Sequence, residues 1–518
     1  MNKRVIKGIF AFAAVFMTAC FITVQPEKAQ AAQAVPINSA EDFLKMENDS
    51  SGNYYLTKDI TVPANTTLFK DFYKQFNGTL DGKGHKIKGY TYSVDVWTDY
   101  SGLFGYAKNA TFKNLTMSDV NISLKKGGYA CVLAAYPTKC KFQNITVSGK
   151  ITVSGTTSHA AVIAVTAGGK CEFTKCVNKA DITVNAYDVT NSADADYVDE
   201  QDGSACGIAS SAYYSTAKNC SNSGKITING DLHWASEGIS AIGLFENIKS
   251  ITGSKNTGTI TAKNVSTGED AGGGVLACGV AGNGSNVISC YNTGKVSASN
   301  NHKEVNMVAA GIMSETSKAL KCYNTGSVQI SGVAGETSGI RSGAGGIGGL
   351  GVYSITESYN TGTVAVKIKN GGIKAGGIAA NICNVRNCYN TGKISTTATE
   401  FSFIGGIAGW QSAFVKAKDQ AVVCNYNTGT VKAGKNITKG AILGYYEVLG
   451  IPDKVNIYNN YYKSGKAYGG TNITWKPFLA RLVKVSSITA KTCPKLSSKY
   501  WVYSSKYKRM ILKNNKQK

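Results

Sequence analysis

Hydrophobic and polar residues alternate in short runs along most of the chain, and nearly the same runs recur. "CYNTGKVSASN" begins at Cys290, and a close copy, "CYNTGSVQISG", begins at Cys322. After each "NTG" an apolar residue stands at every second position, which is the period of a strand with one buried face. None of the repeats keeps a helical period over several turns. The pattern therefore predicts an all-β protein built from short strands.

Aligning the repeats on the asparagine of the "NTG" motif and its variants gives units of 30 to 44 residues. The aligned asparagines are Asn178, Asn222, Asn256, Asn292, Asn324, Asn360, Asn390 and Asn427. Each unit holds a strand of small residues, an apolar stretch that enters the motif, and an alternating strand after it. Three such strands predict one coil of an elongated parallel β-helix, with coils about 4.8 Å apart. We expect these coils to occupy residues 50–470, and we expect the winding to be right-handed.

The motif asparagines have a predicted structural role at one corner of the coil. Asparagine tolerates the left-handed backbone conformation that a sharp corner needs. Asparagine amides stacked from coil to coil can also hydrogen-bond to one another. The glycine two residues later lets the corner close without a side-chain clash. We therefore interpret this asparagine column as a structural feature and not as a reactive one.

The N-terminal residues 1–31 have the composition of a signal peptide. A positively charged start precedes the apolar run "GIFAFAAVFMTACFITV", and small-residue cleavage sites follow near Ala31 or Ala34. Cleavage as a lipoprotein at Cys20 is the alternative. The predicted location is extracellular or cell-surface associated, and the mature chain has no apolar run long enough to span a membrane.

The two ends of the predicted solenoid need caps. Residues 35–49 are predicted to form an N-terminal cap with a short helix, because Ser39 and Asp42 have capping-box spacing ahead of an apolar pair. Residues 475–518 are predicted to form a basic, aromatic C-terminal cap or tail. We expect a strand pair or a last incomplete coil there, with Trp501 and Tyr503 on the face that seals the core.

Three segments near the N-terminus follow one another in a specific order. They are "GNYYLTKDITVP" from Gly52, "FNGTLDGKGHKIKGY" from Phe76 and "SGLFGYAKNATFKNLTM" from Ser101. This order resembles the opening coils of bacterial extracellular β-helix proteins with GLUG-type repeats, and the "CYNTGxV" units look like their later coils. The resemblance implies an exported right-handed parallel β-helix. It implies little about activity, because such repeats occur beside adhesive, proteolytic and carbohydrate-binding modules.

The cysteines suggest two structures. The chain has 14 cysteines, of which Cys20 lies within the predicted signal peptide, so an odd number remains. Four of the others share one column of the repeat: Cys220, Cys290, Cys322 and Cys388. This column favours small buried thiols stacked along a core, and a disulfide framework is the alternative for an exported protein.

The sequence contains few signs of catalysis. The four histidines, His85, His159, His233 and His302, are far apart, and no serine-hydrolase, zinc-protease or phosphate-loop motif is present. Carboxylates are scarce in the repeats except in one acidic stretch, where calcium is the candidate ligand. The candidate metal-binding residues are Asp194, Asp196, Asp199, Glu200 and Asp202. No other cofactor is expected.

Charge gives the main functional signal. The formal net charge is +24, and from Trp475 onward the chain has twelve Lys or Arg and no Asp or Glu. The candidate ligand-binding residues of this end are Trp501, Tyr503, Lys506, Lys508, Arg509 and Lys513. Cations beside aromatic rings suit an anionic polymer, such as a cell-wall polymer or an acidic glycan. A host or cell-surface ligand is an alternative partner, and we do not expect nucleic acid.

Two functions are compatible with these observations. The first is a non-enzymatic, exported surface protein for adhesion, envelope association or glycan binding. The second is a carbohydrate-active enzyme, a polysaccharide lyase or glycoside hydrolase acting on an acidic polysaccharide. A hydrolase needs paired carboxylates on one face of the solenoid, and the repeats show no such pair in sequence.

Overall fold

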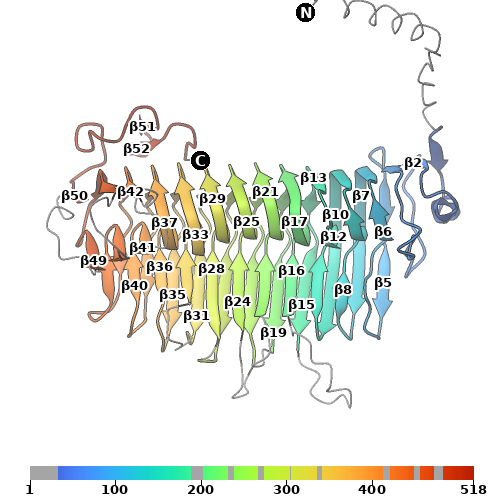
Figure 1. Cartoon of the computed structure of the whole chain (residues 1–518), viewed down its shortest axis with the longest axis horizontal. Helices are drawn as coiled ribbons and strands as arrows, with labels where there is room; N and C mark the ends of the chain where they lie inside the picture. The colour runs from blue at the N-terminus through green and yellow to red at the C-terminus, as the bar shows by residue number, and fades with distance from the viewer. Residues whose placement is uncertain are drawn as a thin grey trace, which may run out of the picture.

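The computed structural model describes residues 33–517 except 188–201, 232–237, 267–272, 304, 335–340, 412–420, 448–455 and 472–481. The chain winds into an elongated parallel β-solenoid in which each coil stacks on the one before it (Figure 1). The predicted fold class, an all-β parallel β-helix with a short N-terminal helix, is confirmed; the right-handed winding stays a prediction. In the part of the chain that is described, no helix is long and apolar enough to cross a membrane.

A coil contains four strands, one more than the sequence pattern predicts. One coil consists of β24 (Gly274–Cys278), β25 (Ala281–Ile288), β26 (Tyr291–Asn292) and β27 (Val296–Asn300). The next consists of β28 (Asn306–Ala310), β29 (Met313–Leu320), β30 (Tyr323–Asn324) and β31 (Val328–Gly332), and each strand pairs in parallel with its counterpart. The predicted small-residue strand is divided because the chain turns a corner at Gly279. A Cβ atom there would lie 2.0 Å from the carbonyl oxygen of Gly311.

Equivalent strands of successive coils form the faces of the solenoid. The ten-stranded face consists of β8 (Gly128–Ala130), β11 (Ser158–Ala161), β16 (Asp202–Cys206), β20 (Gly238–Ile242), β24, β28, β32 (Gly343–Gly345), β36 (Lys374–Gly376), β40 (Phe403–Gly405) and β45 (Thr438–Gly440). A second face includes β7 (Thr111–Leu124), β10 (Lys141–Gly155), β17 (Ala209–Lys218), β21 (Phe245–Thr252), β25, β29, β33 (Gly348–Thr356), β37 (Ala379–Arg386), β41 (Ala408–Gln411) and β46 (Leu443–Tyr446).

The remaining face and the motif corner complete each coil. The motif strands are β14 (Val177–Asn178), β18 (Ser221–Asn222), β22 (Lys255–Asn256), β26, β30, β34 (Tyr359–Asn360), β38 (Tyr389–Asn390) and β43 (Tyr426–Asn427). The strands after the motif are β15 (Asp181–Ala186), β19 (Ile226–Gly230), β23 (Ile260–Asn264), β27, β31, β35 (Val364–Ile368), β39 (Ile394–Thr396) and β44 (Val431–Lys432). The inward positions of all faces form one hydrophobic core along the axis.

The motif asparagines form a buried ladder along one corner. The side-chain amide of each donates to the Oδ1 atom of the next, at 2.7 to 2.8 Å, from Asn178 through to Asn427. All of them are at most 2% exposed. The motif glycines also pack closely, because a Cβ atom at Gly326 would lie 2.0 Å from the carbonyl oxygen of Gly294.

The motif asparagines do not have the left-handed backbone conformation that the sequence analysis predicts, so this prediction is wrong. The left-handed residue stands three positions earlier, as at Ser289 (φ 54°), Lys321 (φ 56°) and Asn387 (φ 51°). The motif asparagine itself belongs to a short strand, which places its amide in line with the amides above and below. Its contribution is therefore the ladder of hydrogen bonds and not the turn.

The thirteen cysteines of the described chain are free thiols. The column residues Cys220, Cys290, Cys322 and Cys388 are at most 1% exposed and lie within the core, as the stacked-thiol interpretation expects. Burial raises the pKa of the Cys322 thiol to about 12. These thiols therefore act as small apolar side chains.

The N-terminal cap is a short helix, α1 (Ala40–Leu44), followed by a 3-10 turn over Lys45–Asn48. The Ser39 hydroxyl accepts the backbone N–H of Asp42 at 3.1 Å, and the Asp42 carboxylate accepts the N–H of Asn38 at 3.0 Å. Phe43 is fully buried, and its ring centroid lies 6.1 Å from that of Phe104. The helix lies between β1 (Val35–Ile37) and β2 (Asn53–Leu56), which pair with each other.

Candidate functional site

The basic C-terminal segment, residues 482–517, folds back along the flank of the solenoid. It begins with β50 (Leu482–Lys484), the last strand of the stack, which pairs with β48 (Asn460–Tyr462). It ends in an antiparallel hairpin of β51 (Trp501–Ser504) and β52 (Arg509–Leu512), drawn beside the last coils in Figure 1. The expected strand pair is present, but the hairpin covers the side of several coils instead of closing the last one.

A stack of tyrosines on the motif corner holds this segment. From Tyr291 onward a tyrosine precedes each motif asparagine, and its side chain points outward because neighbouring strand residues face opposite sides. Tyr291, Tyr323, Tyr359, Tyr389 and Tyr426 stack with centroids 4.7 to 5.0 Å apart and rings 3° to 9° from parallel. The Trp501 ring packs over two of them, 5.5 Å from Tyr426 and 6.1 Å from Tyr389. The segment therefore completes a second hydrophobic cluster outside the main core.

Hydrogen bonds attach the same segment to several coils. The Tyr426 hydroxyl donates to the carbonyl oxygen of Met510 at 2.6 Å. The Asn515 amide donates to the carbonyl oxygens of Cys322 (3.2 Å) and Glu357 (2.9 Å). The backbone of two coils and a side chain of a third are thus joined to one tail. This attachment holds the basic residues in a fixed place on the solenoid.

The structure assigns different roles to the predicted ligand-binding residues. Trp501 is 2% exposed and donates its indole N–H to Asn387 at 3.2 Å, so its proposed part in ligand binding is wrong. Its apolar ring covers the tyrosine stack instead. Arg509 donates to Gln517 at 2.8 Å and lies 5.3 Å from the Tyr507 ring centroid, which makes it partly structural. Tyr503 is 47% exposed.

Lysines dominate the outer surface of the basic segment. Those exposed to solvent are Lys484, Lys491, Lys495, Lys499, Lys506, Lys508, Lys513 and Lys516. Residues 482–517 contain no Asp or Glu. Within the described part of the chain, every ion pair lies between residues 41 and 125, so no described carboxylate comes within 4.0 Å of these ammonium groups. The surface is therefore cationic, and no carboxylate of the described residues neutralises it through an ion pair.

The acidic stretch is mostly outside the described residues. Asp194, Asp196, Asp199 and Glu200 lie in the segment 188–201, so their arrangement is not described. Asp202 opens β16 and pairs by backbone with Gly238, but its side chain is likewise not described. Calcium binding here stays a prediction.

The described histidines lie on separate coils. His85 Nδ1 lies 3.7 Å from the Asp59 carboxylate. His159 stacks on Tyr129 with centroids 5.0 Å apart, and its Nδ1 is 2.9 Å from the Ser204 hydroxyl. Among the residues that the structure describes, no three His, Cys, Asp or Glu side chains gather closely enough to hold a metal ion.

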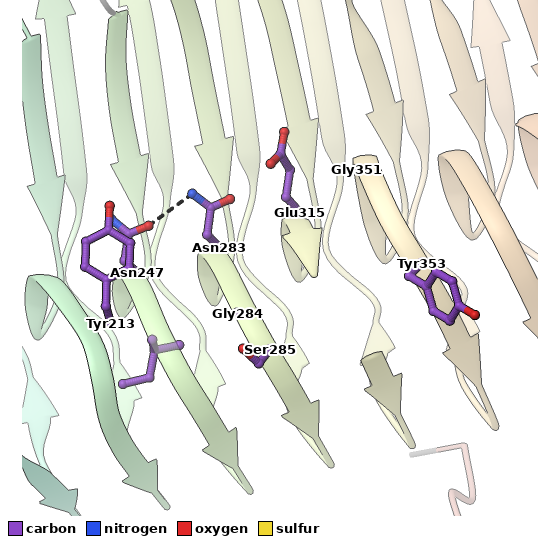
Figure 2. A pocket seen from close by; sticks show the side chains of 9 residues that line it. Tyr213, Asn247, Asn283, Gly284, Ser285, Glu315, Gly351 and Tyr353 are labelled. Atoms are coloured by element: carbon purple, nitrogen blue, oxygen red, sulfur yellow. Dashed lines mark hydrogen bonds between the residues drawn. The ribbon is translucent and has the colours of Figure 1, made fainter. Parts of the chain in front are cut away.

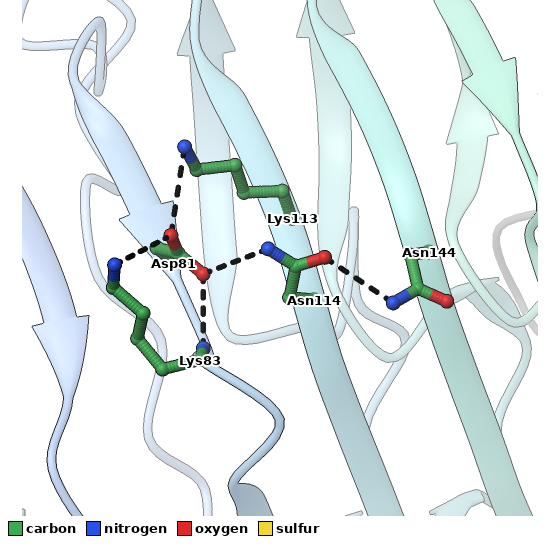
Figure 3. A network of polar contacts seen from close by, with 5 residues as sticks. All are labelled: Asp81, Lys83, Lys113, Asn114 and Asn144. Atoms are coloured by element: carbon green, nitrogen blue, oxygen red, sulfur yellow. Dashed lines mark hydrogen bonds and ion pairs between the residues drawn. The ribbon is translucent and has the colours of Figure 1, made fainter.

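The "DGKGH" turn is organised around Asp81, which is 7% exposed (Figure 3). One carboxylate oxygen accepts the N–H of Lys83 at 2.9 Å and the amide of Asn114 at 3.1 Å, and the other is 3.5 Å from the Lys113 ammonium group. Burial alone would raise the pKa of Asp81, but these hydrogen bonds and charges outweigh it and lower the pKa. Asn144 extends the network by donating to Asn114 at 3.2 Å. Because its acceptors are occupied, this network joins coils and offers little to a ligand.

Comparisons with known proteins add little to this geometry. No family model and no curated protein matches the chain. A solved structure described as a "putative immunoglobulin A1 protease" from Bacteroides ovatus is similar at 13% identity, covering 93% of this chain and 92% of that one, with a TM-score of 0.22. A similarity at that level carries no argument about function. The resemblance to GLUG-repeat proteins therefore rests on the quoted motifs alone.

Proposed function

We propose that this chain is an exported, non-enzymatic surface protein that attaches to an anionic envelope polymer through its basic C-terminal segment. The observation that carries the proposal is the row of exposed lysines on a segment fixed to the tyrosine stack, where none of these lysines forms an ion pair with a carboxylate of the described chain. A fixed array of ammonium groups attracts a polyanion without the ordering cost of a flexible tail. The predicted signal peptide supports export.

The test is a variant in which Lys506, Lys508, Lys513 and Lys516 become glutamine. All four side chains are exposed, so the fold should be unchanged. Binding to purified cell wall and to a teichoic acid should fall in this variant. It should also fall with rising salt in the unchanged protein, because exposed charges are screened beyond about 8 Å at physiological ionic strength.

The matched control removes the same charge from the body of the solenoid. Four lysines there are also exposed: Lys179, Lys225, Lys263 and Lys295. Changing these four to glutamine should leave binding close to that of the unchanged protein. Equal loss in both variants would mean that net charge alone matters, and no loss in either would remove the electrostatic attachment.

A carbohydrate-active enzyme is the second candidate. One observation favours it: Glu246 and Glu315 line the same groove, of about 290 Å³, where β20, β24 and β28 meet the second face. Glu246 also accepts a hydrogen bond from the Ser240 hydroxyl. Glycoside hydrolysis needs two carboxyl groups, so release of reducing ends from acidic polysaccharides, lost in both Glu246→Gln and Glu315→Gln, would establish this function.

A further inference from the structure

Another groove lies on the second face of the solenoid, over the strands drawn in Figure 2. We call it the side groove; its lining includes Tyr213, Asn247, Asn283, Ser285, Glu315 and Tyr353. Its volume is about 390 Å³. The floor comes from β21, β25 and β29, and the two tyrosines come from the flanking strands β17 and β33. From β17 to β33 there are four coil steps, which span about 19 Å.

Irregularities in the two flanking strands distinguish this stretch of the face. In β17, Ala212 pairs with Ile248 and Thr216 with Ser250, so β17 holds two more residues than β21 over the same span. The extra length brings Tyr213 and its neighbour out to solvent, where they are 60% and 69% exposed. Bulges of this kind re-aim side chains and are common beside functional sites.

The strand on the other side is also bulged. Between Gly348 and Val352, β33 holds one residue more than β37 between Ala379 and Ile382. This strand carries Tyr353, which is 37% exposed. The three strands between the bulges keep a continuous register. The solenoid thus departs from its repeat on both sides of one flat floor, and each departing strand carries an exposed tyrosine.

The floor presents polar groups in a single row. Asn247, Asn283, Glu315 and Gly351 pair successively along the coils. The Asn283 amide donates to Asn247 Oδ1 at 3.0 Å, which orients its own Oδ1 away from Asn247, as Figure 2 shows. Gly351 adds no side chain, and the exposed Glu315 side chain lies over it, because a Cβ atom at Gly351 would be 2.6 Å from Glu315 Cγ. The floor therefore offers several acceptors to a ligand rich in hydroxyl donors.

We propose that the side groove binds a neutral oligosaccharide. Tyrosine rings are flat apolar platforms with a polar edge, suited to the C–H face of a sugar ring, and the floor acceptors suit its hydroxyl groups. Among the described residues, the lining includes a carboxylate and no Lys or Arg, which disfavours an anionic ligand. A peptide cannot add a strand here, because the floor strands already pair on both sides.

This site is separate from the attachment proposed above, and the two can be tested apart. Neutral hexasaccharides of β-1,4-linked glucose, β-1,4-linked N-acetylglucosamine and mannose would be titrated into the full mature chain by calorimetry, at low and high salt. At least one should bind with little dependence on salt. The variant Tyr213→Ala with Tyr353→Ala should weaken that binding about tenfold or more. Tyr353→Phe alone, which keeps the ring, should retain most of it.

Two controls make the outcome decisive. Tyr503→Ala removes a tyrosine of similar exposure from the hairpin, and the four-lysine variant removes the basic attachment; neither should change hexasaccharide binding. Melting curves should be the same for all variants, because the substituted side chains are exposed. Absence of binding to every hexasaccharide, or binding that survives loss of both groove tyrosines, would overturn the proposal. Binding confined to acidic polymers and lost in the lysine variant would also overturn it.

Discussion

Replacing Asn324 by alanine removes a middle rung of the asparagine ladder. Its Oδ1 accepts from Asn292, and its amide donates to the carbonyl oxygen of Gly326 and to Asn360 Oδ1, each at 2.8 Å. The residue is fully buried, so water cannot take over these bonds. A net hydrogen bond contributes about 1 kcal/mol, and a buried group left unpaired costs about 1–3 kcal/mol. We therefore expect the free energy of unfolding to fall by about 3–5 kcal/mol.

Urea denaturation followed by circular dichroism measures this change. The midpoint should shift downward while the slope stays the same, because both proteins expose the same surface on unfolding. Asn121→Ala is the matched control; this asparagine is exposed in β7, so its loss should change the free energy by less than about 0.5 kcal/mol. A loss of less than about 1 kcal/mol for Asn324→Ala would refute the ladder as a source of stability.

Replacing Asn324 by aspartate separates hydrogen bonding from packing. The side chain keeps its size, but the ionised carboxylate cannot donate to Gly326 or Asn360, and burial disfavours its charge. Its folded-state pKa should therefore rise above the unfolded value of about 3.9. The deficit is then largest at neutral pH and shrinks as the pH falls through the folded pKa, where the carboxyl group regains a proton to donate. A deficit that stays constant from about pH 8 to about pH 5 would contradict this reasoning.

Three further predictions concern the repeats. Gly326→Ala places a Cβ atom 2.0 Å from a backbone oxygen of the preceding coil, so thermal melting should show that the free energy of unfolding falls by about 3 kcal/mol or more. Gly434→Ala is the control and should be tolerated, because the nearest atom to its Cβ would be 3.9 Å away. Iodoacetamide at neutral pH should modify the half-buried Cys424 and spare Cys322 until urea unfolds the chain, as peptide mass spectrometry can show. Burial raises the pKa of Tyr323 from 10 to about 12, so stability should be lost as the pH rises through that interval, and the part of the tyrosinate absorbance that comes from buried tyrosines should appear together with unfolding.

The repeat arithmetic was enough to predict the architecture. Apolar residues at every second position after "NTG", and a recurring asparagine, specify a stack of coils because only that stack places all copies in equivalent surroundings. The conformation within the corner could not be predicted in the same way. The left-handed position holds Ser289, Lys321, Glu357, Asn387 and Cys424 in successive motif coils, and that variety hides it from a composition rule. The geometry of the turn, and not the residue type, selects the conformation there.

The sequence predicted the basic C-terminal segment as a candidate site but not the side groove. The concentration of positive charge at the C-terminus identified the basic end. It could not distinguish Trp501, which is buried against the tyrosine stack, from Tyr503, which is exposed. That distinction depends on where the tail folds, which local sequence does not specify. The side groove was missed for a related reason. Tyr213 and Tyr353 become a pair only through the strand register and bulges, and their positions in the sequence are 140 residues apart.

The residue type at the position before the motif asparagine changes in the coils that the C-terminal segment covers. In earlier coils it holds Val177, Ser221 and Lys255, and from Tyr291 onward it is tyrosine in each successive motif. This position points outward, so a stack of tyrosines there would leave a continuous apolar strip in water unless something covered it. The C-terminal segment reaches back to Asn515, which binds the backbone at Cys322, and the tyrosine run begins one coil before that point. Ser221 and Lys255 occupy coils that the tail does not reach, where a polar residue is suitable. The tyrosine run therefore extends over the same coils that the tail covers. Because that contact fixes the lysines to the solenoid, the attachment that we propose would hold a polymer along the motif corner, whereas the side groove lies over β21, β25 and β29.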